Sequence, residues 1–494
     1  MDAQYEPVIG LEVHAQLLTR SKMFCRCGTT YAGAAANTHI CPICAGFPGV
    51  LPVTNAHAVE LATRVGIALS CEIAETSRFD RKHYPYPDLP KGYQVSQYDL
   101  PLASGGSVTL GDGEESRRIG IVRVHMEEDT GRLLHRTAPN GTVYSLVDLN
   151  RSGVPLLEIV SEPEIRSAAE AREYVMKLRQ ILRYIGASSG NMEEGALRCD
   201  ANVSVRPFGE YVLGAKVEIK NLNSFRMIER AIDHEISRQI QALEAGTTIE
   251  QETRGWDEAA GVTLAQRTKE YASDYRYFSE PDLPPLTVSA DRLRDVLGKL
   301  AELPDARRAR LVLQYGVTSD DASVLTTTRE TADYFEAVVA HLDGRAPARL
   351  AAVWVTGELF RLLNRDALSI TDSRVTPTLL AELVEMVHSG EVNRGSGRAI
   401  LEELYESGGS PRGIATERDL TQISDTDALA PVVRTVLDNN PRAVGEYFSG
   451  KQQVIGFLVG QVMKATGGTA DSATVRALLL RELSEQPAEG PVSQ

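Results

Sequence analysis

The change in hydrophobic periodicity near residue 290 constrains the fold of this chain more than any other feature of its sequence. Residues 1–290 contain short alternations of apolar and polar residues between turns rich in Gly and Pro, the pattern of antiparallel strands. From Asp291 onward the apolar residues recur at helical spacing, beginning with Leu293, Val296, Leu297 and Leu300. The sequence therefore predicts an α+β fold, in which an antiparallel-sheet domain precedes an all-helical region.

The length of the chain also predicts more than one domain. A single core rarely grows beyond about 250–300 residues, whereas this chain has 494. The segment Ser407–Gly413 combines Gly, Ser and Pro without periodicity, which is typical of a hinge. We therefore expect a sheet domain at 1–290, a helical domain at 291–406 and a helical tail domain at 407–494, with roughly the last nine residues disordered.

Four of the predicted strands carry ionisable residues on one face. Alternation along Ile9–Gln16 leaves Glu12, His14 and Gln16 opposite an apolar face, and at Ile121–Glu127 it assigns Val122, Val124 and Met126 to the apolar face. The polar faces of the other three segments carry Arg123, His125, Glu127, Arg198, Asp200, Asn202, Lys216, Glu218 and Lys220. A solvated sheet face explains any one strand, but four strands of this chemistry favour a cradle that holds metals and phosphates.

The carboxylates on these strands suggest a magnesium site. Glu12 and His14 share one face at positions i and i+2, which suits one divalent cation or one hydrogen-bonded pair. Magnesium prefers oxygen ligands and bridges phosphates, so Glu127, Glu128 and Glu158 are natural co-ligands where the fold brings them together. Strand alternation favours Glu127 over its neighbour. Because imidazole is an unusual ligand for Mg²⁺, a plain hydrogen-bonding role for His14 remains the alternative.

Four cysteines form the spacing C-x-C-x13-C-x2-C, at Cys25, Cys27, Cys41 and Cys44. The N-terminus lacks the basic stretch and apolar core of a signal peptide, so we expect a cytoplasmic chain with reduced thiols. Four thiolates then predict a closed tetrahedral zinc site that staples the loop 23–49 and takes no part in chemistry. Cys71 and Cys199 lack such partners and are expected in the core.

Composition excludes several classes of function. The longest apolar runs are far too short to cross a membrane. A net charge of −15 argues against bulk electrostatic adhesion to DNA or RNA, so any RNA contact must be local. The phosphate-binding loop G-x-x-x-x-G-K-[ST] and the common hydrolase motifs are absent, as is an amidase signature that would release ammonia from glutamine.

Several segments resemble the B subunit of the glutamyl/aspartyl-tRNA amidotransferase over essentially the whole chain. The most specific is HYPYPDLPKGYQVSQYD at 83–99, because so long an ordered run of mixed chemistry hardly recurs by chance. The others are IGLEVHAQL at 9–17, VHMEEDTGR at 124–132, SLVDLNRSGVPLLEIVSEPEI at 145–165, MEEGALRCDANVSVRP at 192–207, KVEIKNLNSFR at 216–226, DYRYFSEPDLPPL at 274–286 and GQVMKATGG at 460–468.

The resemblance implies a kinase-like catalytic cradle, a helical domain and a tail related to a small tRNA-associated domain (YqeY-like). It implies a ligase in protein biosynthesis that phosphorylates the side-chain carboxylate of Glu-tRNA(Gln) or Asp-tRNA(Asn) with ATP, after which ammonia displaces phosphate. In the family, a glutaminase A subunit supplies the ammonia and a small C subunit completes a heterotrimer. Which misacylated tRNA is the substrate, or whether both are, stays open.

The resemblance also implies site residues. The family's Mg²⁺ ligands map onto His14, Glu127 and Glu158, with Glu12 beside them as a further catalytic residue. We expect an ATP or acceptor-end pocket to be lined by Lys82, Lys91, Tyr93, Gln94, Ser96, Gln97, Arg198, Asp200, Asn202, Lys216, Glu218 and Lys220. Tyrosines at 84, 86, 93 and 98 are candidates for stacking a terminal adenosine, with core packing as the alternative.

Two other functions stay open from the sequence. One is a zinc-stapled adaptor whose ionic sheet only grips tRNA. The other is an ATP-dependent ligase that acts on a small free carboxylic acid without RNA. The long helical tail argues against this function, because a small substrate would not need such reach.

Overall fold

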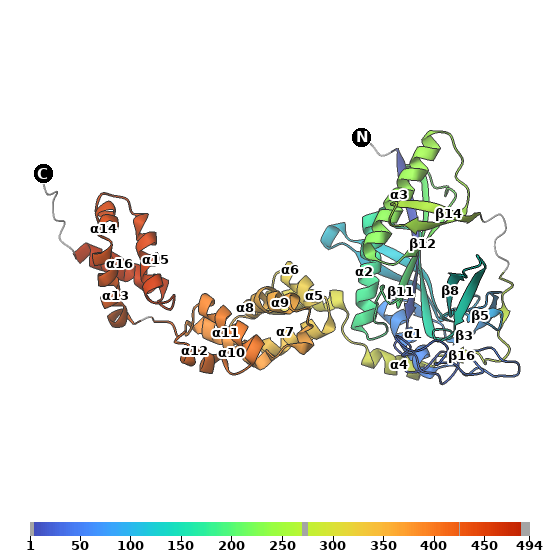
Figure 1. Cartoon of the computed structure of the whole chain (residues 1–494), viewed down its shortest axis with the longest axis horizontal. Coiled ribbons are helices and arrows are strands. Elements are labelled where there is room, and N and C mark those ends of the chain that lie inside the picture. The colour runs from blue at the N-terminus through green and yellow to red at the C-terminus, as the bar shows by residue number, and fades with distance from the viewer. Residues whose placement is uncertain (1–3, 269–274, 424, 486–494) are drawn as a thin grey trace. The chain divides into compact units, whose positions relative to one another are not determined.

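The computed structural model describes residues 4–268, 275–423 and 425–485, and it divides the chain into two compact units, Met1–Leu303 and Pro304–Gln494 (Figure 1). The first unit holds the sheets and the second is helical, so the α+β prediction is confirmed. The division into three domains at 290 and 406 stays a prediction. The proposed disordered tail, 486–494, lies outside the described residues.

A nine-stranded sheet organises the first unit. Its strand order is β14-β13-β12-β11-β1-β10-β7-β6-β2, and all neighbours are antiparallel except β12 and β13. The strands are β1 (Tyr5–Gln16), β2 (Glu72–Ile73), β6 (Ala103–Leu110), β7 (Arg117–Glu128), β10 (Pro155–Ser161), β11 (Leu197–Pro207), β12 (Val217–Leu222), β13 (Glu252–Asp257) and β14 (Val262–Thr268).

Three smaller sheets, four α-helices and a 3-10 turn at Gly113–Glu115 complete the described part of this unit. In the first small sheet, β4 (Asp80–His83) lies between β15 (Phe278–Ser279) and β5 (Tyr93–Ser96); the others pair β16 (Leu286–Thr287) with β3 (Thr76–Ser77) and β8 (Arg132–Thr137) with β9 (Val143–Asp148). The helices are α1 (Ala56–Ala68), α2 (Ala168–Tyr184), α3 (Phe225–Glu244) and α4 (Ala290–Lys299).

One face of the main sheet builds the hydrophobic core. Along β1, Leu11, Val13 and Ala15 are buried whereas the side chains between them are only partly covered. Helices α2 and α3 pack side by side over the buried face (Figure 1). Ser167 and Ser224 cap their N-termini by accepting hydrogen bonds from backbone N–H groups. The opposite face of the central strands is thereby left for polar side chains.

The alternation predicted for β7 is wrong at one residue. Val122 is exposed, and Ile121 is buried in its place. The pairing of β10 with β7 explains the difference, because the register shifts between Val160 and Ser161 and leaves Val122 without an opposing residue. Such a bulge inserts one extra residue and restores the alternation only beyond it. Val124 and Met126 are buried as predicted.

Helix α4, the first helix after the change of periodicity, belongs to the first unit. Helix α4 contacts α1, and the guanidinium of Arg292 donates to the backbone oxygen of Ala56 at 3.1 Å. The division between the two units follows Leu303. The change of periodicity at Asp291 therefore precedes the end of the first unit by about one helix.

The second unit contains two hydrophobic clusters. One draws on residues 311–415 around the buried Trp354, and the other on residues 429–483. The helices are α5 (Pro304–Tyr315), α6 (Ser319–Leu325), α7 (Arg329–Leu342), α8 (Ala348–Val353), α9 (Phe360–Arg365), α10 (Pro377–Ser389), α11 (Arg394–Ser407), α12 (Pro411–Glu417), α13 (Thr426–Asn439), α14 (Pro441–Phe448), α15 (Val454–Ala465) and α16 (Ser472–Glu485). In the described parts of the chain, no helix is long and apolar enough to cross a membrane.

The packing of α2 gives a stability prediction. Leu178 is fully buried in the main core, so Leu178→Ala should lower the free energy of unfolding of this unit by about 2–5 kcal/mol. Urea unfolding followed by the fluorescence of Trp256, in a Trp354→Phe background, measures this unit alone. On the same helix Met176 is exposed, and Met176→Ala should change the free energy by less than about 0.5 kcal/mol. Equal losses in the two variants would contradict the assigned packing.

Candidate active site

The polar face of the main sheet lines a cavity of about 1170 Å³. Its wall comes from the central strands β11, β1, β10 and β7, and from the small sheet formed by β4 and β5. Binding cavities for small molecules usually measure about 300–1,000 Å³. This one is therefore large enough to hold more than one chemical group.

A cross-strand row of ionisable residues crosses the floor of the cavity. His14 on β1 lies opposite Glu158 on β10, and Glu158 lies opposite His125 on β7. The distance from His14 Nε2 to Glu158 Oε2 is 3.3 Å, and from His125 Nε2 to the same oxygen it is 3.4 Å. Because directly opposed side chains are close neighbours in an antiparallel sheet, strand register alone brings these three groups together.

Glu127 completes the cluster. Its Oε1 lies 3.8 Å from His14 Nε2, and one ligand atom from each of His14, Glu127 and Glu158 falls within 4.8 Å of the others. Glu128 lies on the opposite face of β7, where it forms an ion pair with Lys91 and accepts a hydrogen bond from the backbone N–H of Val95 at 2.8 Å. Geometry thus distinguishes the two glutamates as alternation predicted.

The electrostatics of the cluster follow from two carboxylates buried together. Burial and the neighbouring charge of Glu158 raise the pKa of Glu127. Burial also opposes ionisation of Glu158, but the imidazoles of His125 and His14 hold its pKa well below the usual range. Burial alone would lower the pKa of His14, whereas its hydrogen bond to Glu158 and the surrounding carboxylates raise it to about 9. The cluster therefore attracts positive charge.

Cations of the chain surround this cluster. Burial opposes the charge of Lys82, but Glu127 and Glu158 raise its pKa above the ordinary value. Arg198 donates to Asp129 at 2.8 Å, and Lys220 donates to Asp200 at 2.7 Å. Among the described residues, three buried nitrogens on this wall have no hydrogen-bond partner: Nε of Arg123, Nδ1 of His125 and Nε of Arg198. Unsatisfied buried donors are costly, so a polar ligand suits this wall.

The structure places most of the expected site residues on this cavity. Glu12, His14, Lys82, Gln94, Ser96, Gln97, Glu127, Glu158, Arg198, Asp200, Glu218 and Lys220 all line it. Lys82 and Gln94 are register partners on β4 and β5, and Ser96 follows Gln94 on the same face. Alternation along β5 therefore explains why Gln94 and Ser96 both face the cavity.

Four expected residues lie outside this cavity. Tyr93 points to the other face of β5, where it lies under Arg81 and Lys91, and both Lys91 and Tyr93 line a separate cavity of about 240 Å³ beside the cysteine loop. Asn202 lies off the wall and donates to Glu12 at 2.9 Å. Lys216 is exposed just before β12 begins. Alternation along β5 accounts for Tyr93, and the start of β12 after Lys216 accounts for that lysine.

Sequence reasoning missed a second group of wall residues. These residues are Asp129, Thr130, Asn221, Asn223, Tyr275, Arg276 and Tyr277. Arg123, His125 and Tyr98, which the sequence analysis did name, line the cavity too. Tyr275 and Tyr277 reach it because Phe278 on β15 pairs with Arg81 on β4. No local pattern predicts a pairing over such a separation. The motif DYRYF did mark these tyrosines as part of the resemblance.

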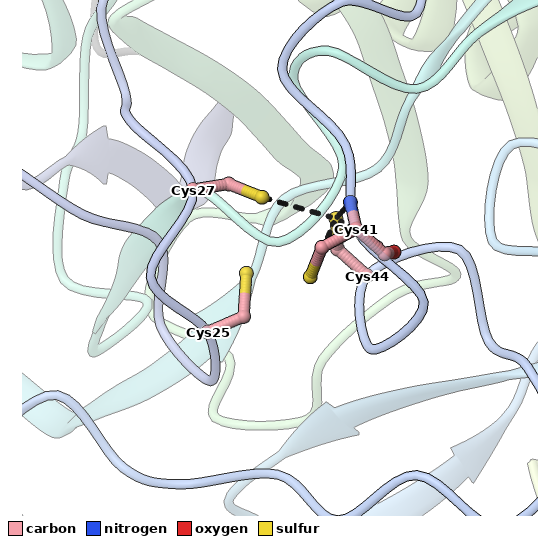
Figure 2. A group of neighbouring side chains, drawn as sticks. All are labelled: Cys25, Cys27, Cys41 and Cys44. Atoms are coloured by element: carbon pink, nitrogen blue, oxygen red, sulfur yellow. Dashed lines mark hydrogen bonds between the residues drawn. The ribbon is translucent and has the colours of Figure 1, made fainter.

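The four predicted cysteines converge into one cluster (Figure 2). Cys25 and Cys27 come from one turn and Cys41 and Cys44 from another, and the Sγ of Cys44 lies 4.0 Å from those of Cys27 and Cys41. A tetrahedral zinc site with Zn–S bonds of about 2.3 Å places its sulfurs about 3.8 Å apart. The donor set and its spacing therefore fit a zinc ion.

A buried lysine supports negative charge in this cluster. Lys22 is fully buried, and its Nζ lies 3.6 Å from the Sγ of Cys44 and 3.2 Å from the backbone oxygen of Leu149. The hydrogen bond with Cys25 and the charge of Lys22 lower the pKa of Cys44 to about 4. Burial instead raises the pKa of Cys71, outside the cluster, to about 11. The environment of Cys44 thus favours a thiolate, the form that binds metal, whereas burial and the neighbouring thiols raise the pKa of Cys25 and Cys27.

Comparison with known proteins agrees with the resemblance. Residues 7–294 match the GatB/GatE catalytic domain, and residues 333–483 match the GatB domain. Proteins named as the B subunit of aspartyl/glutamyl-tRNA(Asn/Gln) amidotransferase are 53% identical in Moorella thermoacetica (97% of this chain, 100% of the relative) and 52% identical in Thermomicrobium roseum (98% and 100%). The protein of that name in Dehalococcoides mccartyi is 50% identical (98% and 99%). The chain therefore belongs to the family of these B subunits, as the motifs predicted.

The cysteine cluster predicts a bound structural metal. The chain should purify with stoichiometric zinc, and Cys44→Ser should lose it and melt at a lower temperature, because structural zinc contributes directly to folding. Metal analysis and thermal unfolding measure both effects. Cys71→Ser is the matched control and should keep the metal. Full zinc content in the Cys44→Ser variant would contradict the site.

Proposed function

We propose that this chain activates the side-chain carboxylate of Glu-tRNA(Gln) or Asp-tRNA(Asn) with ATP and then amidates it. The observation that carries the proposal is the convergence of His14, Glu127 and Glu158 from three strands onto one cavity wall. Family membership supports the same reaction, since the relatives are named as subunits of this tRNA amidotransferase. The chain is accordingly a ligase that forms a carbon–nitrogen bond.

Magnesium is the metal that fits the cluster. Glu127 and Glu158 supply the carboxylate oxygens that Mg²⁺ prefers, and His14 supplies a third donor once its proton is released. Glu12 lies beside them on β1 and is held by Asn202. When bound, the metal would supply positive charge that offsets the negative charge developing during transfer.

The residues of the chain would bind and orient the reacting groups. Lys82, whose pKa both carboxylates raise, is placed to hold a phosphate, while Arg123 and Arg198 offer unpaired donors to a carboxylate or phosphate. A carboxylate oxygen of the aminoacyl group attacks the γ-phosphorus, and the bond to the β,γ-bridging oxygen breaks to release ADP. Ammonia then attacks the acyl carbon and phosphate leaves. In phosphoryl transfer, positioning of the reacting groups and stabilisation of charge supply most of the lowering of the activation barrier.

Partners complete the reaction. The chain carries no amidase signature, so the ammonia must come from another chain. Family membership supports a glutaminase A subunit as that chain, with a small C subunit in the same heterotrimer. Misacylated tRNA is the substrate, with the helical tail as its second contact, and the cytosol is the expected compartment. The four clustered cysteines hold zinc, which fixes the loop 23–49 beneath Lys91 and Tyr93.

Replacing Glu127 tests the proposal. In the assembled complex, Glu127→Gln should reduce tRNA-dependent phosphoryl transfer from ATP by at least about 100-fold, because one oxygen donor of the cation site loses its charge. Binding of the misacylated tRNA should stay within a few-fold. Glu210→Gln is the matched control, since Glu210 is exposed between β11 and β12 and lies off the cavity wall, and it should leave the rate unchanged.

The same assay separates the two alternatives. An RNA-binding adaptor would lose no chemistry in Glu127→Gln, and wild-type complex would transfer no phosphate. A ligase for small acids would turn over free glutamate without tRNA. Either result would reject the proposal, whereas dependence of ATP hydrolysis on the misacylated tRNA would support it.

A further inference from the structure

Two tyrosines stack on each other at the cavity wall. The rings of Tyr98 and Tyr277 are nearly parallel, with 4.2 Å between centroids and 9° between planes, and both line the cavity. Tyr275 meets the ring of Tyr277 edge-on at 6.0 Å. Aromatic rings at such distances hold one another in a defined orientation.

The backbone around these tyrosines is fixed. Asp80 is buried and accepts hydrogen bonds from the backbone N–H groups of Tyr98 at 3.0 Å and Asp99 at 3.3 Å. The backbone N–H of His83 donates to the oxygen of Tyr275 at 2.7 Å, and the pairing of β15 with β4 begins directly after Tyr277. The stacked pair is therefore anchored on both sides before any ligand arrives.

One ring face remains open. Tyr277 covers one face of Tyr98, yet Tyr98 is 57% exposed while it lines the cavity. A buried packing role does not explain such exposure, because a ring used for the core is covered on both faces. An exposed, oriented ring face is a stacking surface for a planar group.

The stacked pair shares its cavity with the charged cluster. Lys82 lies 4.7 Å from the centroid of Tyr275, and Lys82, Glu127 and Glu158 line the same cavity as Tyr98. A planar base on Tyr98 would thus occupy one cavity with cations and with the carboxylate cluster. That combination matches a nucleotide, whose base and phosphates are joined through a sugar.

We propose that Tyr98, held by Tyr277, is the stacking site for an adenine base. This inference rests on the proposed function, because both substrates it names carry adenine: ATP, and the terminal adenosine at the 3′ end of tRNA. Stacking on tyrosine recognises the π-face of the base and leaves its edge free for other contacts. Tyr84 also lines the cavity, whereas Tyr86 and Tyr93 lie off its wall.

Binding measurements on the assembled complex test this site and distinguish the two sources of adenine. The probes are Mg-ATP alone, full-length tRNA, and the same tRNA lacking its terminal adenosine. Tyr98→Leu should weaken one adenine ligand by roughly 5-fold to 150-fold, the range expected from loss of one stacked base, and Tyr98→Phe should bind within about twofold of wild type because it keeps the ring. Tyr211→Leu, at an exposed tyrosine between β11 and β12 that lies off the cavity wall, is the matched control and should bind both ligands normally.

Each outcome bears on the proposal. Weaker ATP binding alone assigns the site to the nucleotide; weaker binding of full-length tRNA alone, with the truncated tRNA unaffected, assigns it to the 3′ end. Normal binding of both ligands by Tyr98→Leu would overturn the proposal, as would equal losses in Tyr98→Phe. If the Tyr98→Leu variant fails to assemble, Tyr98→Trp takes its place in the binding measurement. Its larger ring should bind the ligand at least as tightly as wild type. Because binding needs no turnover, an inactive wild-type complex would reject the proposed function without deciding this site.

Discussion

Two carboxylates buried side by side must be compensated by positive charge, and the rest of the first unit is arranged around this constraint. Glu127 and Glu158 lie within 4.8 Å on neighbouring strands, where burial makes their charges costly and mutually repulsive. Imidazoles of His14 and His125 on both sides of Glu158 offset part of that cost. A divalent cation offsets it more fully. The cluster is therefore stable chiefly as a binding site for positive charge, which is the property that phosphate transfer needs.

The remaining parts of this unit hold that cluster in place. Helices cover the apolar face of the main sheet, and the polar side chains on the opposite face of the central strands therefore line the cavity. On the other side of β7, Glu128 pairs with Lys91, which belongs to the turn between β4 and β5 and borders the cysteine loop. The cysteine loop, the aromatic pair and the carboxylate of Glu127 thus all lie beside the small sheet of β4 and β5, although only the carboxylates would touch the catalytic metal.

The sequence predicted the parts of this site that depend on period-two alternation and missed those that depend on tertiary pairing. Glu12, His14 and Glu127 were identifiable because each alternates with apolar neighbours on its own strand, whereas Glu158 lies in a continuously apolar strand and was named as a co-ligand and through the family resemblance. Tyr93 and Lys91 lie outside the main cavity, because a motif quoted as one run does not reveal which residues face which side. The burial of Val122 was predicted wrongly because a bulge on β7 leaves this residue without a partner on β10. Tyr277 was missed because β15 pairs with β4, a strand far from it in the sequence.

The most direct measurement of the cation site is anomalous diffraction from Mn²⁺, which replaces Mg²⁺ at oxygen-rich sites, in crystals of the complex with a nucleotide bound. If the carboxylate cluster holds the cation of the nucleotide, an anomalous peak should lie at bonding distance, about 2.0–2.3 Å, from oxygens of both Glu127 and Glu158. A nucleotide bound with its metal away from these two carboxylates, or a cavity whose His14 and Glu158 lie far apart, would contradict that assignment.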